Sequence, residues 1–454
     1  MKIRYILKTS IFLLLLTICN SWSYQPPKNV IIMIGDGMGK SHIQIANYYL
    51  EGADSVQPYE QFPIHLFCST YPGTITKEGK YTRFYDSKTA WTDFEYLKIK
   101  PTDSAPAATA ISTGRKTYDG SIGISLDTAK LVHFFQIAKQ KGRSTGVVTS
   151  VPLSHATPAG FIAHNISRNN YVSIAQEMIE SQTDVIIGCG HPDFDDNGQK
   201  VDSSNYDYVG GPDYWNKLQN GYKGWKLIQT KEEFEMEAKK ATSKRLFGVP
   251  QVRSTLQQER KGDAFGKPFS VPFIASVPNL STMSLAALNT LNQNPNGFCL
   301  MIEGGAIDWA SHANQSGRLV EEMDEFNKAV KSVIKWVEQN SSWDETLLII
   351  TADHETGYIT GPKENDNNPY TNPILNQGKG NLPNFRWNHK QHTNSLVPFY
   401  AKGKHANIFK IFADEFDLVR GYYITNSEIS IALKLLFDFE GIIDNPDANF
   451  IQPK

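Results

Sequence analysis

Cysteine is scarce in this chain, with four residues among 454. Cys19 lies in the N-terminal apolar segment, and the other three, Cys68, Cys189 and Cys299, are an odd number that cannot all pair with one another. Cys189 and Cys299 lie in apolar runs typical of buried strands, where free thiols are common. We therefore expect no disulfide framework.

A charge excess of either sign is also missing. Lys and Arg number 45 against 47 Asp and Glu, which gives a formal net charge of -2. This balance gives no indication of a nucleic-acid-binding or membrane-binding surface. Apolar residues make up 40% of the chain, enough for a large core, so composition indicates a large globular protein and leaves its function open.

Long apolar runs are absent beyond the N-terminus. A basic start precedes an apolar run at 11–18 that is too short to span a bilayer, and small residues flank Trp22 at 21–23. We expect residues 1–23 to be a signal peptide and 24–454 to be a periplasmic or secreted mature domain without an integral membrane segment. Cys19 follows a bulky Ile, so we do not expect a lipid anchor there.

Short apolar runs, each followed by turn or polar residues, recur along the chain and predict buried strands. They are residues 30–34, 145–149, 184–187, 298–302 and 347–351. Helical patterns lie between them, most clearly an apolar stripe from Val320 to Val337. The alternation predicts an α/β fold: a three-layer α/β/α sandwich around a central, mostly parallel sheet.

Two regions interrupt this alternation and are expected to be loop insertions. Residues near 191–225 are rich in Asp, Asn, Gly and Tyr, and residues near 361–389 are rich in Asn, Pro and Gly. Thr230 and Glu233 have the spacing of a capping box, so we expect a helix to begin there.

Acids and histidines follow the predicted strands, where the sites of such sheets form. They are Asp36, Glu303, Asp308, Asp353 and His354. His312 lies four residues after Asp308, on the same face of a helix. One such pair alone is more often a surface contact, but several at strand ends favour a metal centre. Mixed Asp and His ligands suit zinc, and oxygen ligands suit magnesium.

Ser104 is a candidate nucleophile. It begins a run of small residues that reads as a helix start, where backbone amides and the positive end of the helix dipole favour an anion. Taken alone, Ser104 would be a helix cap and Arg168 a surface charge. Their functional interpretation depends on the neighbouring metal-ligand candidates.

Six segments occur together in one order that resembles the alkaline phosphatase family. They are residues 29–39, 103–114, 155–168, 303–312, 351–355 and 391–393. The resemblance implies hydrolysis of phosphate monoesters through a covalent phosphoserine on Ser104, with two Zn²⁺ and one Mg²⁺. It also implies that Arg168 binds two phosphate oxygens, the bidentate contact that Arg favours.

The resemblance also implies three ligand sets. The first zinc would be bound by Asp308, His312 and His392. The second zinc would be bound by Asp36, Asp353 and His354, with Ser104 completing the set. Magnesium would be held by Asp36, Thr157 and Glu303.

Two positions vary within the family. Some members have Asp where this chain has His155, so His155 contacts magnesium either directly or through water. Some have Lys or His where this chain has Trp309, which cannot supply a positive charge to phosphate. A homodimer is also implied, although some members are monomers, and no nucleic-acid partner is expected.

Two other functions compete with this interpretation. One is a phosphodiesterase or sulfatase of the same metal-hydrolase superfamily. Ser104-Ala105-Pro106 resembles the start of a sulfatase motif, but position 108 is Ala where that motif has Arg. The other is a non-catalytic, exported phosphate- or metal-binding protein. Such a protein would be expected to have lost the nucleophile or a zinc ligand, and this chain has lost neither.

A half-match to a calcium loop occurs at Asp193-x-Asp195-x-Asn197-Gly198. Its twelfth position is Ser204, where such loops carry Glu. An exposed, Asp-rich turn is the expected structure.

Overall fold

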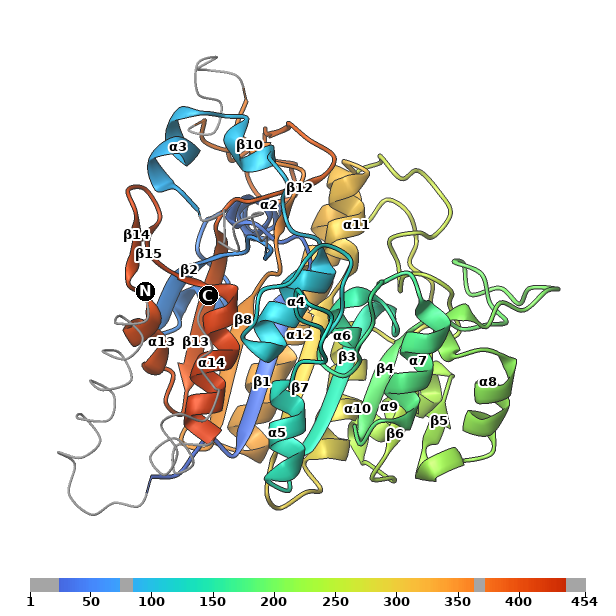
Figure 1. The fold of residues 1–454 in the computed structure, drawn as a ribbon. Helices are drawn as coiled ribbons and strands as arrows, with labels where there is room; N and C mark the ends of the chain where they lie inside the picture. The colour runs from blue at the N-terminus through green and yellow to red at the C-terminus, as the bar shows by residue number, and fades with distance from the viewer. Residues whose placement is uncertain (1–23, 74–84, 363–371, 438–454) are drawn as a thin grey trace.

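The computed structural model describes residues 24–73, 85–362 and 372–437 (Figure 1). The predicted signal peptide, Cys19 and residues 363–371 of the second predicted insertion lie outside these ranges. No helix among the described residues is both long and apolar enough to cross a membrane. Cys68, Cys189 and Cys299 are buried and unpaired, as predicted.

An eleven-stranded sheet forms the centre of the molecule, in the order β14-β15-β2-β13-β8-β1-β7-β3-β4-β6-β5. The strands are β1 (Asn29–Gly35), β2 (Ile64–Ser69), β3 (Ser144–Pro152), β4 (Val185–Cys189), β5 (Lys226–Ile228), β6 (Leu246–Gly248), β7 (Phe298–Gly304), β8 (Thr346–Thr351), β13 (Val397–Gly403), β14 (Glu415–Asp417) and β15 (Gly421–Thr425). All five predicted strands are present, at β1, β3, β4, β7 and β8.

The sheet is mostly parallel, as predicted. Strands β8, β1, β7, β3 and β4 pair in parallel, and β13 runs antiparallel to both β8 and β2. Every residue of β1, β7 and β8 is buried, which explains why these strands read as continuous apolar runs and not as alternating ones.

Helices cover both faces of the sheet, which gives the predicted three-layer sandwich (Figure 1). One layer contains α2 (Lys40–Glu51), α9 (Lys231–Lys239), α10 (Leu280–Leu291) and α12 (Ser316–Asn340). The other contains α4 (Ser104–Thr113), α5 (Phe134–Gln140), α6 (Ala156–Ala159), α7 (Tyr171–Glu180) and α14 (Asn426–Phe437). Three further short helices are α3 (Ser87–Thr92), α11 (Ala306–His312) and α13 (Ile408–Phe412).

Two local predictions about helices are confirmed. The stripe from Val320 to Val337 is the inner face of α12, which packs on α10 and α2. Thr230 caps α9: its side chain accepts a hydrogen bond from the Glu233 amide, and the Glu233 carboxylate accepts one from the Thr230 amide.

The regions expected to be insertions contain regular structure of their own. Residues 191–225 include α8 (Pro212–Gln219), which buries Trp215 and Leu218. The described part of 361–389 includes β11 (Arg386–Trp387), which pairs with β10 (Ile359–Thr360). A second short pair joins β9 (Glu355–Thr356), which follows β8, to β12 (His392–Thr393). This pairing brings His392 close to the end of β8.

The half-match to a calcium loop folds as a hydrogen-bonded turn. The Asp195 carboxylate accepts hydrogen bonds from the amides of Asn197 and Gln199, and the Asp193 carboxylate accepts one from the Ser204 hydroxyl. Because the protein itself satisfies these carboxylates, they form an Asp-rich turn as expected, but Asp193 and Asp195 are half-buried and not exposed.

Candidate active site

Four neighbouring strands bring the predicted site residues to one edge of the sheet. Asp36 directly follows β1, Glu303 lies in β7, and Asp353 and His354 follow β8. Helix α11 begins just after β7 and carries Asp308 and His312. Strand β12 places His392 beside β9, so four segments that are distant in the sequence meet at this edge.

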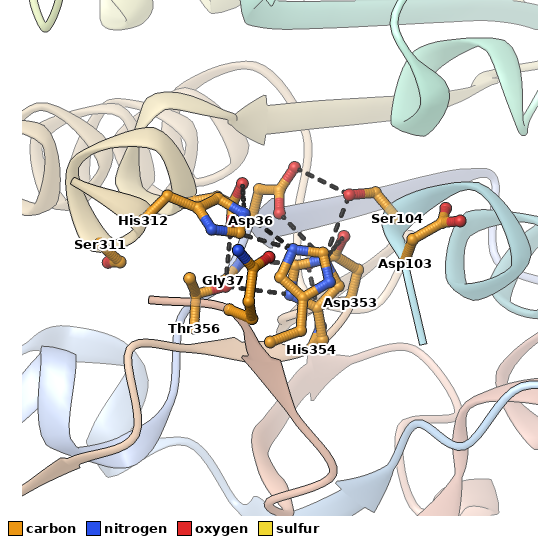
Figure 2. A network of polar contacts seen from close by, with 12 residues as sticks. Asp36, Gly37, Asp103, Ser104, Ser311, His312, Asp353, His354 and Thr356 are labelled. Atoms are coloured by element: carbon orange, nitrogen blue, oxygen red, sulfur yellow. Dashed lines mark hydrogen bonds and ion pairs between the residues drawn. The ribbon is translucent and has the colours of Figure 1, made fainter. Parts of the chain in front are cut away.

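The Ser104 hydroxyl lies among these side chains. Ser104 is the first residue of α4, and the preceding Asp103 caps the helix by accepting a hydrogen bond from the Ala105 amide at 2.6 Å. Ser104 Oγ lies 3.2 Å from His354 Nε2 and 3.5 Å from Asp36 Oδ2 (Figure 2). The hydroxyl therefore sits at the amide end of a helix, with a histidine and a carboxylate beside it.

Asp36, Asp353 and His354 form one group that could hold a metal ion. His354 Nε2 lies 3.5 Å from Asp36 Oδ1 and 3.2 Å from Asp353 Oδ2. Both of these carboxylate oxygens are buried and have no hydrogen-bond donor among the described residues. Buried acceptors without a donor are costly, and a cation between them would satisfy them.

Asp308, His312 and His392 form a second convergent group. His312 Nε2 lies 3.3 Å from Asp308 Oδ2 and 3.0 Å from His392 Nε2, and His392 Nε2 lies 3.6 Å from Asp308 Oδ1. His354 shares this region, because its ring stacks on that of His392 with 3.6 Å between centroids. Asp308, His354 and His392 also offer ligand atoms close enough to hold one ion.

The hydrogen bonds of the Nδ1 atoms in His312 and His392 decide the protonation of the Nε2 atoms. His392 Nδ1 lies 2.8 Å from the Thr102 carbonyl oxygen, and His312 Nδ1 contacts the Lys390 carbonyl oxygen. A carbonyl accepts but does not donate, so both Nδ1 atoms must carry the proton in the neutral rings. Each Nε2 then presents a lone pair toward the other and toward the Asp308 carboxylate, which fits a metal ligand set.

The acid–base properties of the site lead to the same conclusion. Burial, with the nearby Asp353 and Asp308 carboxylates, raises the pKa of Asp36 well above its usual range. Burial and the Asp308 charge raise the pKa of Asp353 to about 7. Burial and the neighbouring His392 hold the pKa of His354 well below its usual value. Several carboxylates that resist ionisation together with neutral imidazoles are what a dication would stabilise.

Glu303 and Thr157 lie on the β3 side of Asp36. Glu303 is buried and accepts a hydrogen bond from the Thr149 hydroxyl, and burial raises the pKa of its carboxyl group. His155 Nε2 is buried without a partner among the described residues, while its ring stacks on Tyr171 with 5.3 Å between centroids. Oxygen ligands dominate this part of the site, which suits a hard cation such as magnesium.

Arg168 supplies the positive charge of the site. Its guanidinium donates to Asp103 Oδ1 at 3.2 Å, so the residue that caps α4 also orients the Arg. Arg168 and Ser104 line a cavity of about 520 Å³, together with Asp36, His155, Thr157, Glu303, Asp308, His312 and His392. Among the predicted site residues, Asp353 and His354 are not part of this lining; both are buried, and His354 contacts Ser104 and Asp36, which are part of it.

Several supporting residues were not found by sequence analysis. The Thr356 hydroxyl donates to Asp308 Oδ1 at 2.5 Å and lies 3.3 Å from His354 Nδ1, so it links the two groups of ligands. Its position two residues after His354 was the available signal. Glu259 also lines the cavity, but it comes from an irregular segment that no strand or helix pattern marks.

A family model described as alkaline phosphatase matches residues 27–384. The chain belongs to the alkaline phosphatase family. It is 30% identical over 364 residues to alkaline phosphatase 4 of Bacillus subtilis, a match covering 78% of this chain and 66% of that protein. It therefore spans slightly less than two thirds of that relative's length.

Other members of the family align over more of their length. Alkaline phosphatase of Escherichia coli is 28% identical over 442 residues, covering 88% of this chain and 86% of that protein. The alkaline phosphatase of the Antarctic bacterium TAB5 superposes with a TM-score of 0.63 at 24% identity, covering 92% of this chain and 99% of that one. This superposition supports the alkaline phosphatase fold described above.

Proposed function

We propose that this protein hydrolyses phosphate monoesters to an alcohol and inorganic phosphate, with Ser104 as the nucleophile. The observation that carries the proposal is the position of the Ser104 hydroxyl. It lies at the start of α4, 3.2 Å from His354 Nε2, in a cavity that Arg168 also lines. Membership of the alkaline phosphatase family supports the same reaction.

We assign the metal-binding residues as three sets. The first zinc would be held by Asp308, His312 and His392, whose ligand atoms converge within the distances given above. The second zinc would be held by Asp36, Asp353 and His354, with Ser104 beside them. Magnesium would be held by Asp36, Thr157 and Glu303, with His155 near the same position.

When bound, the metals would lower the pKa of the serine hydroxyl and stabilise charge on the attacking and leaving oxygens. Ser104 Oγ attacks phosphorus in line with the departing alcohol and becomes phosphorylated. Arg168 donates two hydrogen bonds to non-bridging oxygens and keeps the phosphoryl group aligned. Water then cleaves the phosphoserine, which restores the Ser104 hydroxyl and releases inorganic phosphate.

The charge of the site favours monoesters over diesters. A terminal phosphate carries two negative charges, and Arg168 together with the bound cations would neutralise both. A diester carries one negative charge and a second alcohol group, so it would gain less from the same contacts.

Hydrolysis of p-nitrophenyl phosphate at alkaline pH by the purified protein, loaded with zinc and magnesium, tests this function. A p-nitrophenyl phosphodiester and the sulfate ester would be measured beside it. We expect monoester turnover that is abolished by chelator and falls at least about 1,000-fold in Ser104→Ala. Faster turnover of the diester or the sulfate would contradict the proposal, as would no turnover of any ester.

We also propose that the protein is exported and that residues 1–23 are removed. The basic start, the short apolar run and the small residues at 21–23 support this. Cell fractionation with N-terminal sequencing tests it, and the expected first residue is Tyr24. A homodimer is the assembly that the family resemblance favours, and light scattering on the purified protein measures it.

A further inference from the structure

Glu259 places a carboxylate on the wall of the phosphate cavity, an unexpected charge in a site for anionic substrates. Glu259 is exposed, and no hydrogen bond or ion pair of its side chain is found among the described residues. Arg168 is the one Lys or Arg among the described residues that line the cavity. The cavity wall therefore carries a carboxylate that no ion pair among the described residues occupies.

The segment that carries Glu259 is held firmly in place. The residue before it, Gln258, is buried and donates to Gln315 Oε1 at 2.8 Å, next to the start of α12. The residue after it, Arg260, is also buried and donates to Glu321 Oε2 at 2.9 Å and to the Pro272 carbonyl at 3.0 Å. Because both neighbours point inward and are fixed, the backbone of Glu259 is fixed at the cavity.

Trp309 adds an aromatic surface to the same cavity. It follows Asp308 on α11, is half-buried, and lies 5.6 Å from the His155 ring between centroids. An indole face attracts cations, and more strongly than other aromatic rings do. Trp309 and Glu259 thus give the cavity one aromatic face and one free carboxylate.

Ser104 and Arg168 fix the phosphoryl group of a substrate, so its alcohol part must extend toward the open side of the cavity. Glu259 is exposed and Trp309 is half-buried, whereas Ser104 and Glu303, which line the same cavity, are buried. We propose that these two residues form a leaving-group subsite selective for monoesters of cationic amino alcohols, of the choline and ethanolamine type. This inference rests on the phosphatase function proposed above.

Two nearly isosteric esters isolate the effect of the cation. Choline phosphate carries a trimethylammonium group, and 3,3-dimethylbutyl phosphate carries a neutral tert-butyl group of the same shape. The measured quantity is the ratio of kcat/KM for the cationic ester to that for the neutral one. The two alcohols differ in acidity, but this intrinsic difference cancels when the same ratio is compared between variants.

We expect this ratio to fall about three- to fivefold in Glu259→Gln and by a similar factor in Trp309→Leu. It should also fall toward the Glu259→Gln value as salt is raised in the wild type, because an exposed charge is screened. Glu232→Gln is the matched control: Glu232 is exposed on α9, outside the cavity, and its ratio should equal that of the wild type.

Calorimetric titration with the two corresponding phosphonates gives a second readout that needs no turnover, and its ratio of Kd values should shift in the same way. Unchanged ratios in Glu259→Gln, with both esters hydrolysed, would overturn the subsite while leaving the phosphatase function intact. No hydrolysis of either ester by a metal-loaded wild type that hydrolyses p-nitrophenyl phosphate would also overturn the subsite. No hydrolysis of any of the three esters would overturn the phosphatase function, and the subsite with it.

Discussion

Thr356 shows how a single hydroxyl supports the proposed metal ligands. It donates to Asp308 and contacts His354 Nδ1, so it orients one ligand from each group. We predict that Thr356→Val, which keeps the shape and removes the hydroxyl, weakens zinc binding about 10- to 100-fold. Competition with a fluorescent chelator measures this.

Thr92→Val is the control for that experiment, because Thr92 is an exposed threonine at the end of α3 and lies outside the cavity. Its zinc affinity should equal that of the wild type. Equal affinities for all three proteins would show that the Thr356 hydroxyl has no part in orienting the ligands.

Gly37 is a second residue that the site requires, here for a steric reason. Its φ is +71°, and a Cβ atom would lie 2.8 Å from Thr356 Oγ1 and 3.0 Å from the Asp308 Cα. We predict that Gly37→Ala lowers the free energy of unfolding of the metal-free protein by about 2–4 kcal/mol. Urea denaturation followed by circular dichroism measures this loss.

Gly378→Ala separates the cost of backbone strain from the cost of the close contacts. Gly378 has a φ of +80° but nothing within 4 Å of its Cβ position, so its replacement adds backbone strain alone. We expect a loss of about 1 kcal/mol there. If both variants lose the same stability, the close approach of Gly37 to Thr356 and Asp308 has no energetic weight.

At the scale of single residues, sequence analysis identified the residues proposed as metal ligands but not the residues that hydrogen-bond to them. Asp36, Asp308 and Asp353 were visible because acids after buried strands stand out against their surroundings. Thr356 and Glu259 were not, because an isolated hydroxyl or a surface-like glutamate acquires its role only from partners distant in the sequence.

At the scale of elements, the capping box of α9 allows the contribution of a helix cap to stability to be measured. Thr230→Ala removes the acceptor for the Glu233 amide, and we predict a loss of about 1 kcal/mol in the free energy of unfolding. Thermal or urea denaturation measures it. Met236→Ala, at an exposed position of the same helix, should cost less than about 0.5 kcal/mol, and an equal loss would contradict the capping role.

The five long buried strands could be predicted because each is a continuous apolar run, and α12 because its apolar stripe has helical spacing. The short strands β5 and β6 could not, since three residues carry too little pattern. Nor could the order of strands, because it depends on which distant segments pack together. Strand β13 is buried over most of its length, like β8, with which it pairs antiparallel, so its apolar residues do not reveal its direction.

At the scale of the whole molecule, a buried acid makes stability depend on pH. Burial, with the nearby Glu325 and Glu321 charges, raises the pKa of Glu322 to about 8. Between the ordinary pKa and about 8 the folded state keeps a proton that the unfolded state has lost, so the free energy of unfolding falls as pH rises through this window.

We predict that Glu322→Gln reduces this fall, and that urea denaturation between about pH 5 and pH 8 detects the difference from wild type. Glu338→Gln is the control, because Glu338 is exposed on the same helix α12, and its pH profile should follow that of the wild type. Parallel profiles for all three proteins would show that Glu322 does not keep its proton in the folded state.

The central claim is that the phosphoryl group passes through Ser104. Acid quenching of the metal-loaded protein during turnover of a phosphate monoester, followed by peptide mass mapping, tests it most directly. We predict one added phosphoryl group on the peptide that contains Ser104, located on that residue, and none in Ser104→Ala. Monoester hydrolysis with a phosphoryl group on another residue, or undiminished hydrolysis by Ser104→Ala, would contradict the account.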